Sequence, residues 1–214
     1  MIEAALFDMD GLLIDSERVY FQGVQAVAPA LGWQITEEMV AKTLGTTNEA
    51  TDAVFAQGNP GYSGQVLRRE LESWLVREGY DRHMPLKPHA KEILEAFTAR
   101  GIRCGLVTSS PLRSAQAFLK PPGLFSLFSA VVTGDDGLPS KPAPDVFLRG
   151  AKLMGVDIGR CAVLEDSWNG LRAGRAAGAV TVMVPDLVPY GPEIAPCCDF
   201  VATSLREAEA LLCP

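Results

Sequence analysis

Two carboxylates separated by a single residue follow the first apolar segment of the chain. The apolar run 4–7 leads directly into Asp8, Met9 and Asp10. In an extended segment, residues i and i+2 point to the same side, so both carboxylates can enter one crevice. Adjacent carboxylates repel unless a cation lies between them or one is protonated, and Mg²⁺ prefers such oxygen ligands. Taken alone, such a pair is most often a solvated acidic turn. A metal site at Asp8 and Asp10 therefore needs support from other parts of the chain.

Three further segments place polar side chains after apolar runs. Thr108 and Ser109 offer hydroxyl and backbone N–H groups just before a helix, which suits a phosphate oxygen. Lys141 lies in a proline-stiffened loop and can neutralise phosphate or carboxylates. Glu165 and Asp166 end another apolar run, where acids either cap the next helix or hold a metal ion. Each segment has an ordinary structural explanation, but their combination indicates one site for a phosphate group and a metal ion.

The apolar runs that carry these residues alternate with helical patterns. Buried parallel strands are expected at 4–7, 103–107, 130–132, 161–164 and 180–184. Helices are expected at about 89–100, 111–119, 144–154 and 168–177. This alternation predicts an α/β fold with a doubly wound parallel sheet, in which ligands bind outside the carboxyl ends of the strands.

One interval between strands is too long for this pattern. About 95 residues separate the first two strands, whereas a βαβ unit takes roughly 30. Apolar residues recur at helical spacing from Tyr20 to Leu31 and from Leu67 to Leu75, and two shorter helical segments lie between them. The sequence therefore predicts a four-helix domain at 15–82, inserted into a catalytic core formed by 1–14 and 83–214.

Bulk properties limit the classes of partner and compartment. The net charge of −7 argues against a nucleic-acid partner, which would need a basic face. We expect neither a signal peptide nor a membrane segment, because no apolar run approaches the length of a bilayer span. The five cysteines have no CxxC spacing, so we expect reduced thiols and a cytoplasmic protein.

The same segments resemble the four motifs of the haloacid-dehalogenase (HAD) superfamily. Residues 8–17 are similar to the opening of its phosphatase and β-phosphoglucomutase-like branch. Residues 164–170, with the Ala-Gly pairs at 173–174 and 177–178, resemble the fourth motif of that branch. The resemblance extends along almost the whole chain. It implies a Rossmann-like core with a helical cap, in agreement with the predicted insertion.

The resemblance also implies a role for each motif residue. Asp8 would be the nucleophile that forms an aspartyl phosphate. Asp10 would protonate the departing alcohol oxygen and later deprotonate the hydrolytic water. Thr108, Ser109 and Lys141 would bind the phosphoryl group, and Lys141 would also offset the charge of Asp8.

A magnesium ion is the cofactor that the resemblance implies. Its ligands would be Asp8, the backbone carbonyl of Asp10 and Asp166, with Glu165 as a further direct or water-mediated ligand. The substrate would be a small phosphorylated metabolite. We expect a monomer, since a core with its own cap suffices for the chemistry.

The type of reaction depends on residues in the motifs and in the cap. Asp10 disfavours the dehalogenase and phosphonatase branches, which lack this second aspartate. Tyr20 and Asn48, which could bind substrate, occupy positions where mutase members carry a histidine and an arginine. Alternatively, Tyr20 belongs to the core of the cap, and Arg68 or Arg69 binds the second phosphate group instead. We therefore expect a Mg²⁺-dependent phosphatase for a small phosphomonoester, with sugar phosphates favoured. A phosphomutase is the alternative, and a non-catalytic phosphometabolite-binding module is third.

Overall fold

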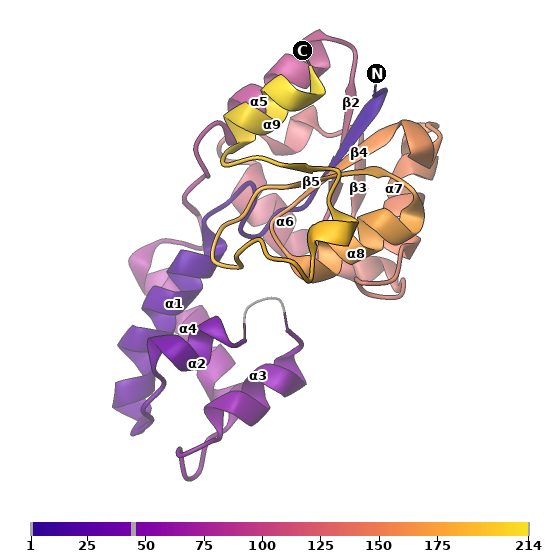
Figure 1. The fold of residues 1–214 in the computed structure, drawn as a ribbon. Helices are drawn as coiled ribbons and strands as arrows, with labels where there is room; N and C mark the ends of the chain where they lie inside the picture. The colour runs from indigo at the N-terminus through magenta and orange to yellow at the C-terminus, as the bar shows by residue number, and fades with distance from the viewer. Residues whose placement is uncertain (1, 44–45, 214) are drawn as a thin grey trace. The chain divides into compact units, whose positions relative to one another are not determined.

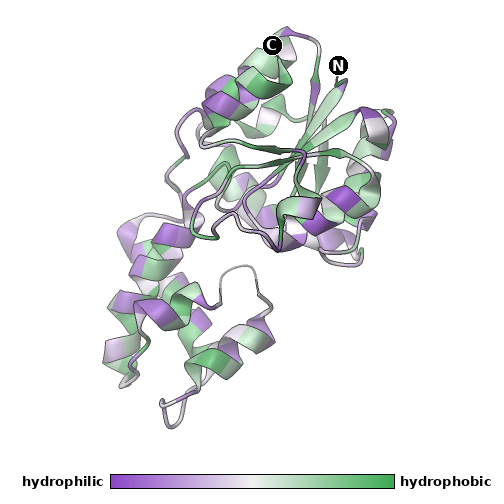
Figure 2. Cartoon of the chain, in the orientation of Figure 1, coloured by the Kyte–Doolittle hydropathy of each residue, from purple (hydrophilic) through white to green (hydrophobic). Residues whose placement is uncertain are grey.

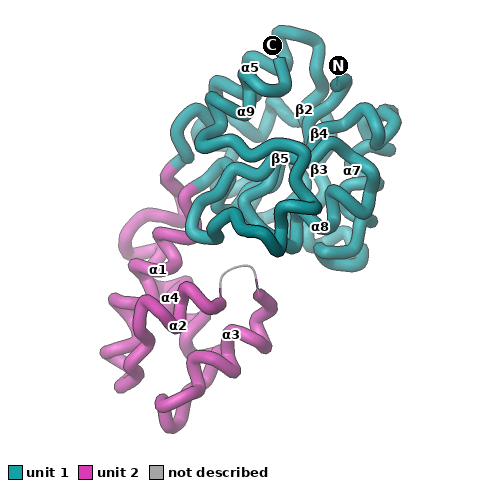
Figure 3. The backbone as a smooth tube through the Cα atoms, viewed as in Figure 1, with its two compact units in different colours: residues 1–14, 86–214 teal, residues 15–85 magenta. Residues whose placement is uncertain are grey.

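The chain forms two compact units, which are connected by two crossings of the backbone. A computed structural model describes residues 2–43 and 46–213. Unit 1 comprises residues 1–14 and 86–214, and unit 2 comprises residues 15–85 (Figure 3). The second crossing thus lies between residues 85 and 86.

A parallel six-stranded sheet forms the centre of unit 1 (Figure 1). Its strands are β1 (Ala4–Phe7), β2 (Arg103–Val107), β3 (Ala130–Val132), β4 (Cys161–Glu165), β5 (Val180–Met183) and β6 (Phe200–Val201). Their order in the sheet is β3-β2-β1-β4-β5-β6. This order belongs to doubly wound Rossmann-like sheets, whose ligand crevice lies where the strand order reverses, between β1 and β4. The predicted α/β fold class is confirmed.

Helices cover both faces of the sheet. Unit 1 contains α5 (Ala90–Ala99), α6 (Leu112–Leu119), α7 (Asp145–Met154), α8 (Trp168–Ala177) and α9 (Leu205–Leu212). Helices α7 and α8 pack on one face, and α5 packs with α9 on the other (Figure 1). The sequence predicted the first four of these helices but neither α9 nor β6. A two-residue strand offers no periodicity from which it could be predicted.

Side chains of β1 alternate between the two faces of the sheet. Leu6 belongs to a buried cluster that includes Phe147 and Met154 of α7. The next residue, Phe7, faces Phe97 of α5, with the ring centroids 5.9 Å apart. A strand buried on both faces needs a continuous apolar run, which is the pattern found at 4–7. Figure 2 shows the same concentration of hydrophobic residues along the central strands.

Unit 2 is built from four α-helices within its described residues. They are α1 (Ser16–Val27), α2 (Glu37–Ala41), α3 (Asn48–Phe55) and α4 (Gly64–Glu78), as the sequence predicted. Helices α1 and α4 pack closely where Gly23 faces Leu71 and Trp74. The sequence also indicates a break between helices at Gly45, which lies outside the described residues. None of the helices in the described ranges is long and apolar enough to cross a membrane.

The two crossings of the backbone are paired with each other. The Asp15 N–H donates to the Pro85 carbonyl at 2.8 Å, and the Lys87 N–H donates to the Leu13 carbonyl at 2.9 Å. Ile14 and Leu86 form an antiparallel bridge between these two hydrogen bonds. Residues 15–85 therefore leave and re-enter unit 1 at one place.

Candidate active site

The register of β1 against β4 brings two acidic residues together. Phe7 is the partner of Leu164 in the parallel ladder, so Asp8 and Glu165 follow at the same level of the sheet. The Asp8 N–H extends the ladder by donating to the Leu164 carbonyl at 3.2 Å. Both side chains thus lie at the carboxyl ends of β1 and β4, where the strand order reverses.

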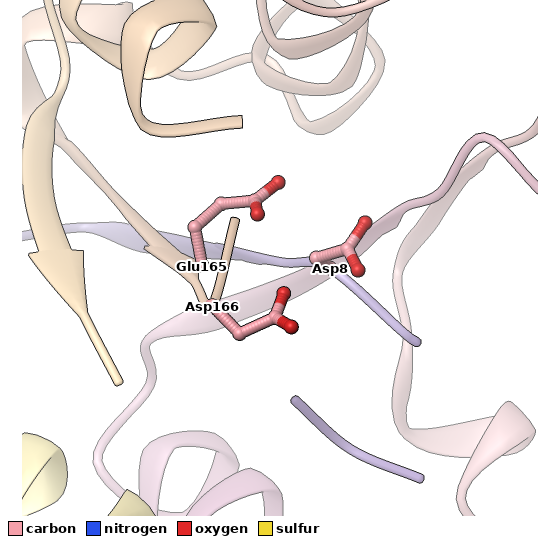
Figure 4. Close-up of side chains that lie close together, drawn as sticks. All are labelled: Asp8, Glu165 and Asp166. Atoms are coloured by element: carbon pink, nitrogen blue, oxygen red, sulfur yellow. The ribbon is translucent and has the colours of Figure 1, made fainter. Parts of the chain in front are cut away.

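Asp166 completes a cluster of three buried carboxyl groups. Asp8, Glu165 and Asp166 each offer an oxygen within 4.8 Å of the others, and all three residues are buried (Figure 4). Carboxylates this close require nearby positive charge to remain ionised. A set of hard oxygen donors in such an arrangement fits Mg²⁺. These three predicted ligands are therefore suitably placed for one ion.

Lys141 supplies one positive charge to this cluster. Its Nζ atom lies 2.5 Å from Asp8 Oδ1, 2.7 Å from Glu165 Oε1 and 3.0 Å from the Val107 carbonyl oxygen. An ammonium group has three protons, so these acceptors engage all of them. Burial alone would lower the pKa of Lys141, but the two carboxylates raise it. Lys141 is therefore held as a cation that offsets the charge of Asp8.

The Glu165 carboxyl group is fully buried and held from two sides. Its Oε2 atom accepts the Ser167 hydroxyl at 2.8 Å and the Ser167 N–H at 3.3 Å, while Oε1 contacts Lys141. Burial raises the pKa of Glu165, and Lys141 opposes that shift. A Cβ atom built on Gly170 would overlap the Glu165 carboxyl group. Glycine at 170 is thus what lets this carboxylate lie against the first turn of α8.

The loop after β2 contacts the second aspartate. Thr108 is buried, and its Oγ1 atom accepts the Ser110 N–H at 3.0 Å. The Ser110 hydroxyl donates to Asp10 Oδ2 at 2.7 Å, and Thr108 Oγ1 lies 3.5 Å from the same oxygen. Ser109 is exposed in this loop. Asp10 is therefore adjacent to Thr108 and Ser110. The contact of Thr108 and Ser109 with a phosphoryl group stays a prediction.

The predicted site residues divide between the two units. Unit 1 contains all those of the four motifs, whereas Tyr20 lies in α1 and Asn48 begins α3, both in unit 2. Burial raises the pKa of Tyr20, with Arg68 opposing that shift and Asp52 adding to it. Asn48 is exposed. The binding of substrate by either residue stays a prediction.

Sequence reasoning missed two residues that hold the site together. Ser110 is not among the residues that the sequence singles out, although its hydroxyl donates to Asp10. Gly170 was seen only as part of the fourth motif, although it makes room for Glu165. Both contacts join side chains whose meeting depends on the register of distant strands, so no local pattern indicates them.

A profile of haloacid dehalogenase-like hydrolases matches residues 2–178, most of the chain. The chain belongs to the haloacid dehalogenase-like hydrolases. Within this family, it is similar to hexitol phosphatase B of Escherichia coli (strain K12), with 33% identity over 86% of this chain and 84% of the relative. It is also similar to a phosphorylated carbohydrates phosphatase of Thermotoga maritima, with 29% identity over 99% of this chain and 90% of the relative.

A solved structure in the family has the same overall fold. The crystal structure of CbbY from Rhodobacter sphaeroides in complex with phosphate superposes with a TM-score of 0.79. The match has 27% sequence identity and covers 97% of this chain and 96% of the other. The predicted membership of the HAD superfamily is thus confirmed from sequence and from fold.

Proposed function

We propose that this HAD-like hydrolase is a Mg²⁺-dependent phosphatase that cleaves a small phosphomonoester, with sugar phosphates as the favoured class. One observation carries the proposal: the Asp8 carboxylate lies beside a buried cation and two further acids at the switch point of the sheet. The names of the hexitol and carbohydrate phosphatases support the choice of substrate class.

Asp8 is the nucleophile in the proposed reaction. One of its oxygens attacks phosphorus, the bond from phosphorus to the alcohol oxygen breaks, and an aspartyl phosphate forms. Asp10 gives its proton to the departing oxygen, and afterwards takes a proton from the water that hydrolyses the intermediate. Two easier steps thereby replace one difficult displacement.

The remaining residues provide charge and orientation. Lys141 offsets the negative charge of Asp8 as the phosphoryl group approaches, while Thr108 and Ser109 donate hydrogen bonds to phosphoryl oxygens. Asp8, Asp166 and the Asp10 carbonyl are the proposed Mg²⁺ ligands, with Glu165 direct or through water. When bound, the ion supplies positive charge that reduces the repulsion between the carboxylates and the phosphate.

A phosphomutase is less well supported, because it must hold a second phosphate group. Tyr20 and Asn48 bring no permanent positive charge to the positions where mutases carry basic residues. The two arginines considered as replacements are already paired within unit 2. Arg68 contacts both oxygens of Asp52, at 2.9 and 3.0 Å, and Arg69 contacts Glu70 at 3.1 Å.

The test is a screen of phosphorylated metabolites and p-nitrophenyl phosphate with Mg²⁺, in which release of inorganic phosphate is measured. We expect release from at least one sugar phosphate and none from the Asp8→Asn variant. Absence of release from every phosphomonoester would contradict a hydrolase. Conversion of β-glucose 1-phosphate to glucose 6-phosphate that depends on added bisphosphate would select the mutase instead.

A further inference from the structure

Ser110 is held so that its hydroxyl is directed at Asp10. Its N–H donates to Thr108 Oγ1 at 3.0 Å, and its carbonyl accepts the Gly134 N–H at 3.0 Å. With the backbone fixed on both sides, the side chain donates to Asp10 Oδ2 at 2.7 Å. The residue that contacts Asp10 is therefore anchored in its own loop and in the loop that follows β3.

The loop after β3 supports the loop that bears Ser110. A Cβ atom built on Gly134 would overlap the Ser109 carbonyl oxygen, so the two backbones touch there. Asp135 Oδ2 accepts the Leu112 N–H at 2.8 Å, at the start of α6. Asp136 and Thr133 in turn close a reciprocal pair of hydrogen bonds within the supporting loop. Two strand-end loops thus fix the position of the Ser110 hydroxyl.

We propose that Ser110 is a positioning residue for Asp10, a role that rests on the proposed phosphatase function. The terminal torsion of an aspartate is broad, so an unrestrained carboxyl group samples many orientations. A general acid, however, must lie within hydrogen-bond reach of the oxygen it protonates. The Ser110 hydroxyl donates to Oδ2 and restricts this torsion, so the Asp10 carboxyl group is held in one orientation for proton transfer.

This role predicts a dependence on the leaving group. In the first step the bond from Asp8 to phosphorus forms, the bond from phosphorus to the alcohol breaks, and the proton on Asp10 moves to the alcohol oxygen. An alcohol leaves poorly without that proton, whereas p-nitrophenolate is stable as an anion and leaves without it. Loss of the Ser110 hydroxyl should therefore impair one kind of ester and spare the other.

The experiment compares benzyl phosphate with p-nitrophenyl phosphate, two aromatic esters of similar size. We measure kcat/KM, which reports only on steps up to formation of the aspartyl phosphate. We expect Ser110→Ala to lower kcat/KM about 10-fold or more for benzyl phosphate and less than about 2-fold for p-nitrophenyl phosphate. The loss on benzyl phosphate would be part of the roughly 10²–10⁴-fold that a general acid contributes to the rate. Ser110→Thr, which keeps a hydroxyl, should retain most of the activity toward benzyl phosphate. Ser114→Ala, a control in helix α6, should leave kcat/KM for both esters unchanged.

Two results would overturn the role of Ser110. The first is an equal loss on both esters in a variant with unchanged thermal unfolding, which would mean that Ser110 only shapes the loop. The second is the same loss in an Asp10→Ala background, where a residue that acts through Asp10 should have no further effect. Absence of Mg²⁺-dependent release from every phosphomonoester, including these two esters, in the wild type is a different result, because it would overturn the phosphatase itself and this role with it.

Discussion

Lys141 Nζ lies 2.7 Å from Oε1 of Glu165, a side chain with no exposed surface. The same nitrogen contacts Asp8, so one cation holds the proposed nucleophile and the neighbouring acid in a fixed relation. Removing one member of a buried ion pair leaves the other charge without compensation.

Replacement of the lysine should mainly affect the chemical step. In Lys141→Ala, Asp8 loses its neighbouring cation, and we expect kcat to fall by about 10²–10³-fold, the typical effect of removing one electrostatic stabiliser. Steady-state release of phosphate measures it. Lys152→Ala is the matched control, since Lys152 is exposed on α7. A kcat for Lys141→Ala that matched this control would contradict the assigned role.

A methyl group at position 170 should disturb Glu165. In Gly170→Ala the new Cβ would overlap the Glu165 carboxyl group, which is buried and cannot move into solvent. We expect a loss of about 1–3 kcal/mol in the free energy of unfolding, as for other overpacked sites, together with lower kcat. Denaturant unfolding measures the first effect. Gly191→Ala, where a Cβ meets no atom within 4 Å, should leave both quantities unchanged.

A methyl group at position 134 should displace the loop that is proposed to bind phosphate. The backbone carbonyl of Ser109 would have to move away from the new Cβ in Gly134→Ala. We expect kcat/KM to fall by up to about 10²-fold, the effect of a small misplacement of groups that orient the substrate. Unlike Ser110→Ala, this variant should impair both esters, with the larger loss on benzyl phosphate because the Gly134 N–H also anchors the Ser110 carbonyl. A loss confined to benzyl phosphate would show that the loop acts through Asp10 alone.

Chelation of divalent ions should abolish turnover, and Mg²⁺ should restore it. Thermal unfolding gives a readout independent of activity, because a ligand that binds only the folded state raises Tm as its concentration rises. We expect Mg²⁺ to raise the Tm of the wild type and to have a much smaller effect on Asp166→Asn. An equal rise in both proteins would exclude Asp166 as a ligand.

The ion pair between Asp52 and Arg68 should stabilise unit 2 in a pH-dependent manner. Both side chains are partly exposed, so we expect a coupling energy of about 0.5–1 kcal/mol from a double-mutant cycle. Fluorescence of Trp33 and Trp74 in a Trp168→Phe background would follow unfolding of this unit.

The pH at which this coupling disappears follows from the direction of the pKa shift. The Arg68 hydrogen bond holds the pKa of Asp52 below its ordinary value. A lowered carboxyl pKa means that the stabilisation is complete above the unfolded value of about 3.9 and is lost as pH falls through the folded value. The more exposed pair Arg69–Glu70 should show weaker coupling at every pH. A coupling between Asp52 and Arg68 that grew on acidification would contradict this account.

The parts of the site that belong to strand ends could be predicted from sequence. Asp8 and Glu165 follow continuous apolar runs, and parallel strands bring their carboxyl ends to one edge whatever the details of packing. Contacts across loops could not be predicted. Ser110 and Asp10 are 100 residues apart, and their meeting depends on strand register and on the backbone of the loop. Similarly, the helices of unit 2 have an apolar periodicity, but the pairing of Arg68 with Asp52 follows from their rotation and has no sequence signature.

The hydrogen bond between Asp15 and Pro85 makes the two ends of the insertion neighbours in space. A chain segment that starts and finishes at one point can be lengthened, shortened or exchanged as a cassette without re-ordering the strands around it. The carboxylates proposed to be catalytic, Lys141 and the loop after β2 all lie outside that segment. Recombination at this one junction would thus replace residues 15–85 without changing the strands and loops that carry the carboxylates and Lys141.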